Sequence, residues 1–411
     1  MHPRPAAIAL AGLVSLAVAM GIGRFAFTPI LPMMLHDRTV DLAQASWLAS
    51  ANYIGYLLGA LLCTFQPWFA ARLGRTGPVN AGRLVRIGLA VTVLLTLAMA
   101  APLPALWPTL RFAAGVTSAV VFVYTTTWCL GRLARLQLPA MGALIYTGPG
   151  AGIALGGLAA SAMVALDWRA TQAWAAFGVL AAMLTALVFR TYGAPEDATP
   201  ASAANAAAAP TTTTAPHHGA TEVALLSTAY GLAGFGYIIT ATFLPVIARQ
   251  TLTASPWLDL FWPIFGASVV VGAIVASRMR VAGDLRVPLV GCFVIQAAGV
   301  AASLVSPTLP GFAVGSILLG LPFTAITFFA MQEIRRIKPA HAPSYMGLAT
   351  ATYGLGQIVG PPLAAGLVAR SATAAAGFSQ ALWIAAGALG LGALLFALLT
   401  KWYPARPASQ N

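Results

Sequence analysis

The chain has 411 residues, of which 59% are hydrophobic and only 8% are charged, and its formal net charge is +13. A soluble domain carries about 25% charged residues, so this composition excludes a soluble protein with a fully solvated surface. At roughly 20 apolar residues per span, the chain has room for about a dozen membrane helices and little else.

Hydrophobic runs predict twelve transmembrane helices in two groups of six. In the first half the predicted spans are 6–34, 43–66, 84–103, 106–130, 142–166 and 170–190. In the second half they are 223–248, 257–277, 287–306, 311–333, 345–369 and 378–400. We therefore expect an all-α membrane protein whose first apolar run is an uncleaved helix rather than a signal peptide.

The predicted domains are two six-helix halves, residues 1–192 and 222–403, followed by a short cytoplasmic tail at 404–411. Residues 193–221 are rich in Ala, Thr and Pro without periodicity, which predicts a flexible cytoplasmic linker. The adjacent histidines in this segment are not expected to form a metal site.

The loop charges favour an orientation with both termini in the cytoplasm. In that orientation sixteen Lys and Arg residues lie in cytoplasmic segments and four lie on the opposite side. The four are Arg38, Arg169, Arg249 and Arg370. The basic charge therefore follows from membrane topology, and we expect no nucleic-acid partner.

The two halves repeat each other in sequence. The first span contains GIGRFAFTPILP at 21–32 and the seventh contains GFGYIITATFLP at 234–245, with Arg24 opposite Tyr237. MGALIYTGPGAGIALGG begins at Met141 and MGLATATYGLGQIVGPP begins at Met346, so spans 5 and 11 also correspond. Their common order along the chain predicts a duplicated six-helix unit.

These motifs resemble those of the major facilitator superfamily, in which two such halves surround a midplane cavity. ARLGR at 71–75 is similar to the end of the superfamily's loop signature, although Ala71 replaces the usual aspartate and Pro67 the usual glycine. RFAAG at 111–115 resembles its span-4 signature, and GPGAGIALGG at 148–157 resembles the span-5 signature typical of antiporters. GIGRFAFTPILP followed by ANYIGYLLGALL resembles the bacterial YbfB/YjiJ-type branch, which implies a location in the bacterial inner membrane.

Two arginines fall inside predicted spans, where an unpaired charge costs several kcal/mol. Arg24 lies roughly 14 Å and Arg111 roughly 8 Å from the outer ends of their helices, so both lie in the outer half of the membrane. The resemblance implies that spans 1, 4, 7 and 10 line the cavity, and two arginines facing it indicate an anion-binding site. The alternative is that each arginine ties helices together through backbone carbonyls or an asparagine.

Three further polar side chains are substrate-binding candidates: Tyr237, Tyr124 and Asn52. Each could stack on or hydrogen-bond a ligand, but packing explains each of them as well. We expect a small-molecule substrate.

Proton coupling normally needs a carboxylate that titrates within the membrane, and Asp259 in the eighth span is the first candidate. Its alternative role is that of a helix-start residue. Glu333 ends span 10 beside Arg335 and Arg336, which favours a cytoplasmic ion pair, and Glu222 suits a helix N-terminus.

Span 5 has a face that is nearly bare of side chains, which allows close helix packing and favours a transporter that works by alternating access. Its glycines are Gly148, Gly150, Gly152, Gly156 and Gly157. The span-5 resemblance favours export over import. A non-transporting sensor, a channel and a facilitated uptake permease are the alternatives that the sequence leaves open.

Other functional classes find little support in the residues. Polar residues form no catalytic cluster at one depth, so we expect no enzymatic activity, and the chain lacks the Gly-x4-Gly-Lys loop of ATP-driven pumps. Cys63, Cys129 and Cys292 lack metal-ligand spacing. We expect no cofactor or metal and a monomer in the lipid bilayer.

Overall fold

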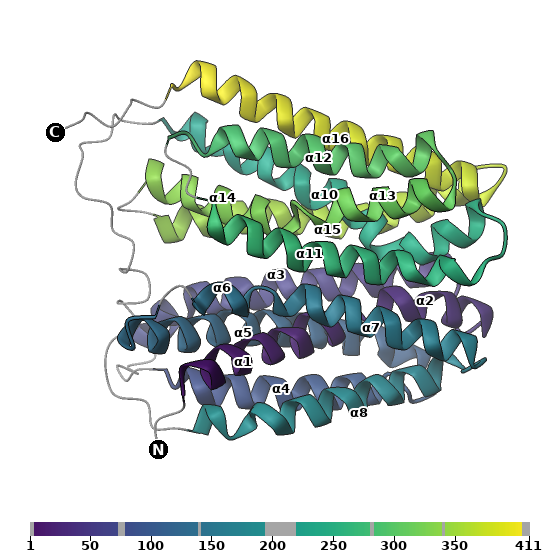
Figure 1. The fold of residues 1–411 in the computed structure, drawn as a ribbon, viewed down its shortest axis with the longest axis horizontal. Coiled ribbons are helices and arrows are strands. Elements are labelled where there is room, and N and C mark those ends of the chain that lie inside the picture. Colours follow the sequence, from purple (N-terminus) through teal and green to yellow (C-terminus); the bar gives the residue numbers. More distant parts are fainter. Residues whose placement is uncertain are drawn as a thin grey trace. The chain divides into compact units, whose positions relative to one another are not determined.

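The computed structural model describes residues 4–72, 79–138, 141–193, 219–279, 283–338 and 342–404. Within these ranges every regular element is helical and no strand occurs. The chain divides into two compact units, Met1–Thr212 and Thr213–Asn411 (Figure 1). Nearly all of the predicted linker, the end of the predicted tail and most of the loop signature at 71–75 lie outside the described residues.

The first unit contains helices that follow the first six predicted spans. They are α1 (Pro5–Leu16), the π-helical turn η1 (Ala17–Ile22), α2 (Phe27–His36), α3 (Leu42–Arg72), α4 (Ala81–Ala98), α5 (Trp107–Arg135), α6 (Gly142–Ile145), α7 (Gly148–Ala165) and α8 (Ala170–Phe189). Two short 3-10 turns, Pro104–Leu106 and η4 (Thr191–Gly193), precede α5 and follow α8.

The second unit contains helices that follow the last six predicted spans. They are α10 (Ala220–Thr251), the 3-10 turn η5 (Pro256–Leu260), α11 (Phe261–Arg278), α12 (Arg286–Val305), α13 (Leu309–Gly320), α14 (Phe323–Ile337), α15 (Ala342–Arg370) and α16 (Ala374–Trp402). Polar caps start several of them; the hydroxyl of Thr373, for example, accepts a hydrogen bond from the amide of Ala376 at the start of α16.

Eleven helical segments within the described residues are long and apolar enough to cross a membrane. The helix α15 is not among them, although its 29 residues extend about 44 Å and exceed the roughly 30 Å hydrocarbon core. Its glycines, its paired prolines Pro361 and Pro362, and Gln357 lower its mean hydropathy. The chain is thus a multi-pass helical protein, and the count of twelve spans stays a prediction.

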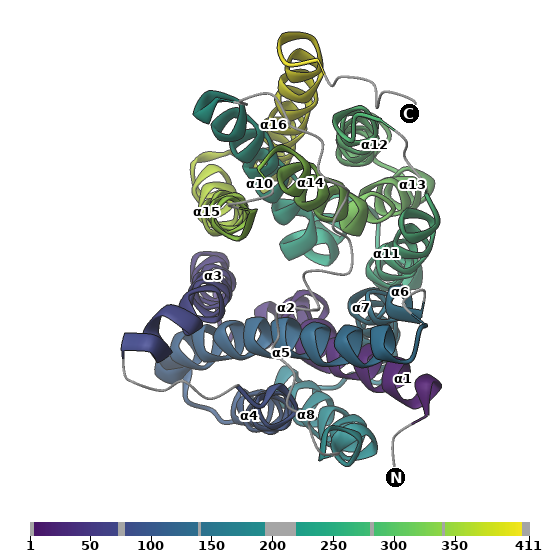
Figure 2. The same cartoon turned by 90° about the vertical axis from the view of Figure 1, so that its left-hand side faces the viewer.

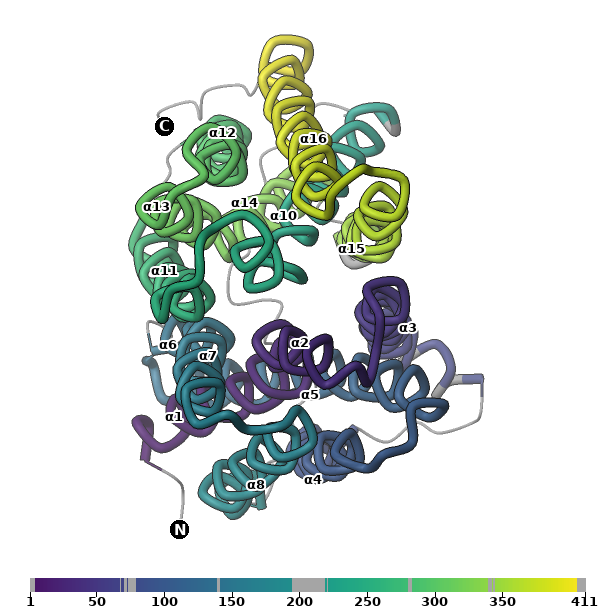
Figure 3. Tube along the Cα trace, turned by 90° about the vertical axis from the view of Figure 1, so that its right-hand side faces the viewer, coloured from purple at the N-terminus to yellow at the C-terminus, as the bar shows by residue number. Residues whose placement is uncertain are grey.

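The same three helix pairings recur in the two units. In the first unit α7 packs against η1, α3 against α5, and α4 against α8. In the second unit α15 packs against α10, α11 against α13 and α14, and α12 against α16. Figure 2 shows α4 beside α8, and Figure 3 shows α12 beside α13. The pairings follow the order of spans 1–5, 2–4 and 3–6 in each unit, as expected of a duplicated structure.

Glycines bring the paired helices close together. A Cβ atom at Gly152 in α7 would lie 2.6 Å from the carbonyl oxygen of Ala17, and one at Gly148 would meet the carbonyl of Leu13. In the second unit a Cβ atom at Gly356 in α15 would lie 2.5 Å from the carbonyl oxygen of Gly231 in α10. Small residues at these positions allow backbone-to-backbone packing within each unit.

Three predicted spans are interrupted rather than continuous. Span 1 changes from α1 to a π-helical turn at 17–22 and restarts as α2 at Phe27, span 5 restarts at Gly148, and span 10 restarts at Phe323. Interruptions of this kind are tolerated in membrane proteins where neighbouring protein groups satisfy the freed carbonyls.

Candidate functional site

The break in span 1 is held by Arg111 from α5. Its guanidinium donates one hydrogen bond of 3.2 Å to the carbonyl oxygen of Gly23 and another of 3.0 Å to that of Arg24. Asn52 on α3 donates a 2.9 Å hydrogen bond to the carbonyl oxygen of Arg111. Both side chains are buried. Arg111 and Asn52 therefore satisfy backbone carbonyls, which is the helix-tying role that the sequence left open for them.

The side chain of Arg24 packs among aromatic rings. Its guanidinium carbon lies 4.0 Å from the ring centre of Tyr56, 5.3 Å from that of Tyr53 and 5.2 Å from that of Phe25. The residue is only 3% exposed. Cation–π contacts of desolvated arginines are worth about 2 kcal/mol, so these rings stabilise the buried charge.

Arg24 and Arg111 lie close enough for their positive charges to interact. Two guanidiniums at one level of the unit create a positive potential there, and the low dielectric of the membrane interior strengthens it. Arg111 also retains a donor, because its Nε atom has no hydrogen-bond partner among the described residues. The pair is therefore an arrangement suited to an anion.

Tyr237, the counterpart of Arg24 in the second unit, belongs to a polar-aromatic cluster. It accepts a hydrogen bond from the amide of Gln357 on α15 and is 1% exposed. Its ring stacks on Tyr353 at 5.9 Å between centroids and meets Phe323 edge-on at 5.0 Å. Further rings extend the series in both directions: Tyr230, Phe265 and Trp262. The sequence signal for this cluster was an amide side chain, Gln357, within an apolar span.

The other substrate-binding candidate, Tyr124, is not brought to this level. It lies thirteen residues beyond Arg111 on α5, about 20 Å along the helix. It is half-buried, and its role as a ligand stays a prediction.

Asp259, the coupling candidate, lies in η5 immediately before α11. It forms an ion pair with Arg249 in the last turn of α10, whose guanidinium also donates a 3.2 Å hydrogen bond to the carbonyl of Pro245. The side chains of Arg249 and Asp259 are 28% and 18% exposed. The pair lies where α10 is followed by η5 and α11, and the coupling role of Asp259 stays a prediction.

The glycines predicted for span 5 all lie in α7. Gly148 and Gly152 make the close contacts with α1 and η1 described above, and Gly156 faces the ring of Phe177. Gly150 and Gly157 are buried in the same helix. Gly148 and Gly152 require glycine because the neighbouring backbone occupies the space of a side chain.

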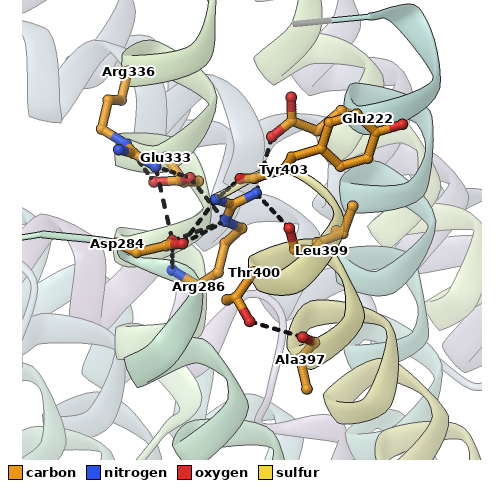
Figure 4. Close-up of polar contacts among 9 residues, drawn as sticks. All are labelled: Glu222, Asp284, Arg286, Glu333, Arg336, Ala397, Leu399, Thr400 and Tyr403. Carbon is orange, nitrogen blue, oxygen red and sulfur yellow. Dashed lines mark hydrogen bonds and ion pairs between the residues drawn. The ribbon is translucent and has the colours of Figure 1, made fainter. Parts of the chain in front are cut away.

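A second cluster, which we call the charged cluster, lies at the end of the second unit where α10 and α12 begin (Figure 4). Arg286 lies at its centre. It contacts Glu222 at 2.9 Å, Asp284 at 2.7 Å and Glu333 at 3.4 Å. It also donates hydrogen bonds to the carbonyl oxygens of Leu399 and Tyr403, at 3.0 and 2.6 Å. One guanidinium thus joins the starts of α10 and α12 to the end of α16.

Arg336 completes the charged cluster by pairing with Glu333 at 2.6 Å. This confirms the ion pair predicted for Glu333, while Glu222, in the first turn of α10, pairs with Arg286 across the unit. Asp284 precedes α12 and lies outside the predicted membrane spans. Burial alone would raise the pKa of its carboxyl group, but hydrogen bonds and charge from Arg286 and Arg336 lower this pKa below its ordinary value.

The comparisons with known proteins identify the family. The family described as "Uncharacterised MFS-type transporter YbfB" matches residues 16–397. The chain belongs to this family. The sequence-based resemblance to the YbfB-type branch of the major facilitator superfamily is therefore confirmed.

Solved structures share the fold of this family member. A mutant of the nucleoside transporter NupG superposes with a TM-score of 0.68 at 15% identity, covering 96% of this chain and 99% of that one. Another NupG structure gives a TM-score of 0.64 at 15% identity, covering 97% and 99%. None of the curated proteins compared matches this chain. The protein is a multi-pass membrane transporter with the fold of the superfamily.

Proposed function

We propose that this family member is a secondary active transporter that exports small organic anions by alternating access. The observation that carries the proposal is the placement of Arg24 and Arg111 at the break in span 1. Arg111 is engaged with backbone carbonyls, whereas Arg24 is held by aromatic rings that a ligand can replace. Arg24 therefore binds the substrate's anionic group, and Arg111 and Asn52 keep the broken helix in place for it.

The second unit holds a separate candidate contact for a solute with a planar ring. Tyr237, Tyr353 and Gln357 combine stacking faces with an amide, which is the chemistry that recognises a flat, hydrogen-bonding solute. NupG is a nucleoside transporter, and its likeness to this chain at 15% identity concerns the fold. Nucleosides therefore enter the ligand screen beside aromatic carboxylates, and Tyr124 is tested as a further contact.

Transport is coupled to protons through Asp259 in this proposal. Protonation of Asp259 releases Arg249, which changes the charge at the junction of α10 and α11 once per cycle. Asp259→Asn should abolish accumulation driven by a proton gradient while retaining exchange of substrate for substrate. Unchanged pH-dependent transport in this variant would assign coupling to another group.

The test of function is a two-step assay on purified protein. Thermal-shift screening compares organic anions, cations, sugars and nucleosides, because a ligand stabilises by an amount that rises with its concentration over its dissociation constant. Hits are then assayed for uptake and counterflow in proteoliposomes with and without a proton gradient. Stabilisation by cations or sugars alone would contradict the anion proposal. Binding without counterflow would favour the sensor. Flux that only follows the substrate's own gradient would favour the uptake permease or the channel.

The proposed setting is a bacterial inner membrane, crossed twelve times with α15 as the eleventh span and both termini in the cytoplasm. The two six-helix halves, 1–192 and 222–403, are joined by a cytoplasmic linker, and the transporter acts as a monomer without cofactor. Reporter fusions at residues 205 and 411 should read cytoplasmic and one at residue 38 external. An external signal at 205 would overturn this arrangement.

A further inference from the structure

The helices α4 and α8, the third and sixth predicted spans, lie side by side (Figures 1 and 2). Residues of both helices line a furrow on the first unit. The volume of the furrow is about 810 Å³. It is lined by small residues, among them Ala90, Ala182 and Ala186, and by Leu94 and Phe189. Leu94 is 64% exposed, so the furrow is open along an apolar surface that suits hydrocarbon rather than water.

One end of the furrow is basic. Arg190 lines it and is exposed. The guanidinium of Arg86 lies 4.1 Å from the ring centre of Phe189, another lining residue. Neither arginine forms an ion pair with a carboxylate among the described residues. Two positively charged side chains therefore lie at one end of the apolar furrow.

The surroundings contain little to neutralise these charges. The chain has no Asp or Glu between residues 42 and 166, so α3, α4 and α5 contribute only positive charge at this end of the unit. The acidic residues nearest in sequence to Arg190, Glu196 and Asp197, lie outside the described residues.

The dimensions of the furrow match one lipid chain. From Arg190 to Ala182 the helix α8 descends about 12 Å, most of one leaflet of a 30 Å hydrocarbon core. Thr185 lines the furrow between them, is 6% exposed, and its hydroxyl has no hydrogen-bond partner among the described residues. It lies about 7.5 Å from the level of Arg190, near the depth of a lipid's ester groups.

We propose that this furrow binds an anionic phospholipid, with its phosphate at Arg190 and Arg86 and one acyl chain along the alanines. Basic residues at the mouth of a cleft between membrane helices select acidic headgroups. The proposal is independent of the transported substrate and of the Arg24 site.

The experiment counts lipids bound to the purified, delipidated full-length protein by native mass spectrometry. Dioleoyl phosphatidylglycerol is titrated against dioleoyl phosphatidylcholine, which has the same chains and no net charge. We expect one molecule of the anionic lipid to bind more tightly than the zwitterionic one. Equal binding of the two would overturn the proposal.

Paired variants test the two parts of the site. Arg190→Gln and Arg86→Gln should each weaken binding of the anionic lipid about fivefold, equivalent to about 1 kcal/mol per basic residue. Arg4→Gln, which removes an exposed charge before α1, should leave it unchanged. An equal loss with Arg4→Gln would show a diffuse charge effect and would contradict a specific site.

The furrow itself is tested by filling it. Ala186→Leu adds bulk at an exposed position and should weaken binding of both lipids at least fivefold without lowering the melting temperature of the lipid-free protein. Ala298→Leu, at an exposed position of α12 in the second unit, is the matched control and should have no effect. Full retention of lipid by Ala186→Leu would rule out the furrow as the binding site.

Discussion

The two units share their helix pairings but distribute charge in opposite ways. In the first unit the buried charges, Arg24 and Arg111, lie at the break of span 1, and the corresponding level of the second unit holds the neutral pair Tyr237 and Gln357. At the end of the second unit the charged cluster surrounds Arg286.

The corresponding end of the first unit has neutral side chains packed between its helices, and its basic residues Arg86 and Arg190 form no ion pair among the described residues. Tyr192, which follows α8, has its hydroxyl 2.9 Å from that of Ser15 and its ring 4.7 Å from that of Trp128. Tyr403 follows α16 in the same way but offers its carbonyl to Arg286. The duplicated scaffold therefore constrains where helices meet, whereas polar chemistry has diverged at equivalent positions.

The largest expected effect separates the corresponding ends of the two units. Arg286→Met leaves Glu222, Glu333 and Asp284 without their common partner, and removing one member of a buried ion-pair network costs about 3–5 kcal/mol. Thermal unfolding of the purified protein should show a large loss of stability. Arg83→Met, in the first turn of α4 and exposed, is the matched variant in the first unit and should change stability by less than about 0.5 kcal/mol. Equal losses would mean that the cluster has no special structural role.

The next comparison distinguishes the two arginines of the first unit. Arg111→Lys removes a two-pronged contact with the carbonyls of Gly23 and Arg24, and should lower stability by about 1.5–3 kcal/mol. Arg24→Lys should instead keep the fold and weaken binding of a transported anion by about 1–3 kcal/mol. Melting temperature and ligand affinity are measured on the same preparations. If Arg24→Lys lowers stability while affinity holds, Arg24 is a helix tie and the anion proposal fails.

These two arginines show which structural features can be predicted from the sequence and which cannot. Spans, the repeat and the glycine face of span 5 were predictable because each is a local pattern of residue types. The partners of Arg111 were not, because every residue has a carbonyl and only the break at Gly23 exposes two of them. Glu222 and Arg286 form an ion pair although they are 64 positions apart in the sequence. Local sequence patterns cannot predict a contact over such a separation.

A third comparison tests whether the duplicated packing is equally strict in both units. Gly152→Ala and Gly356→Ala each place a methyl group against backbone, within 2.6 and 2.5 Å of a carbonyl oxygen, and should each cost about 1–3 kcal/mol. Gly291→Ala in α12 is the control, because a Cβ atom there meets nothing within 4 Å. Alanine favours the helix, so that variant should gain about 0.5–1 kcal/mol. Thermal unfolding provides the measurement, and a cost in one unit alone would contradict equivalent packing.

The smallest effect concerns pH and again contrasts the corresponding ends of the two units. Burial alone would raise the pKa of Asp284, but Arg286 and Arg336 lower it below its ordinary value of 3.8. The unfolded chain then binds a proton more readily than the folded one, so the carboxylate stabilises the fold above about pH 5 and loses this contribution as the pH falls below about 4. Asp284→Asn should therefore cost up to about 1 kcal/mol at pH 7, and this cost should shrink as the pH falls towards 3. At the corresponding end of the first unit, burial raises the pKa of Tyr192 well above its ordinary value of 10.0, so this hydroxyl stays neutral throughout this range.

Unfolding midpoints of the wild type and Asp284→Asn between pH 3 and pH 7 test this expectation. Asp167→Asn is the control in the first unit, since this exposed residue has a positive φ of 54° that asparagine also adopts. Its difference from the wild type should stay near zero at every pH. A difference for Asp284→Asn that is constant from pH 7 to pH 3 would show that the amide loses a packing or hydrogen-bonding role rather than a charge. The contrast between Asp284 in the second unit, whose carboxylate titrates, and Tyr192 in the first unit, which stays neutral, would then not hold.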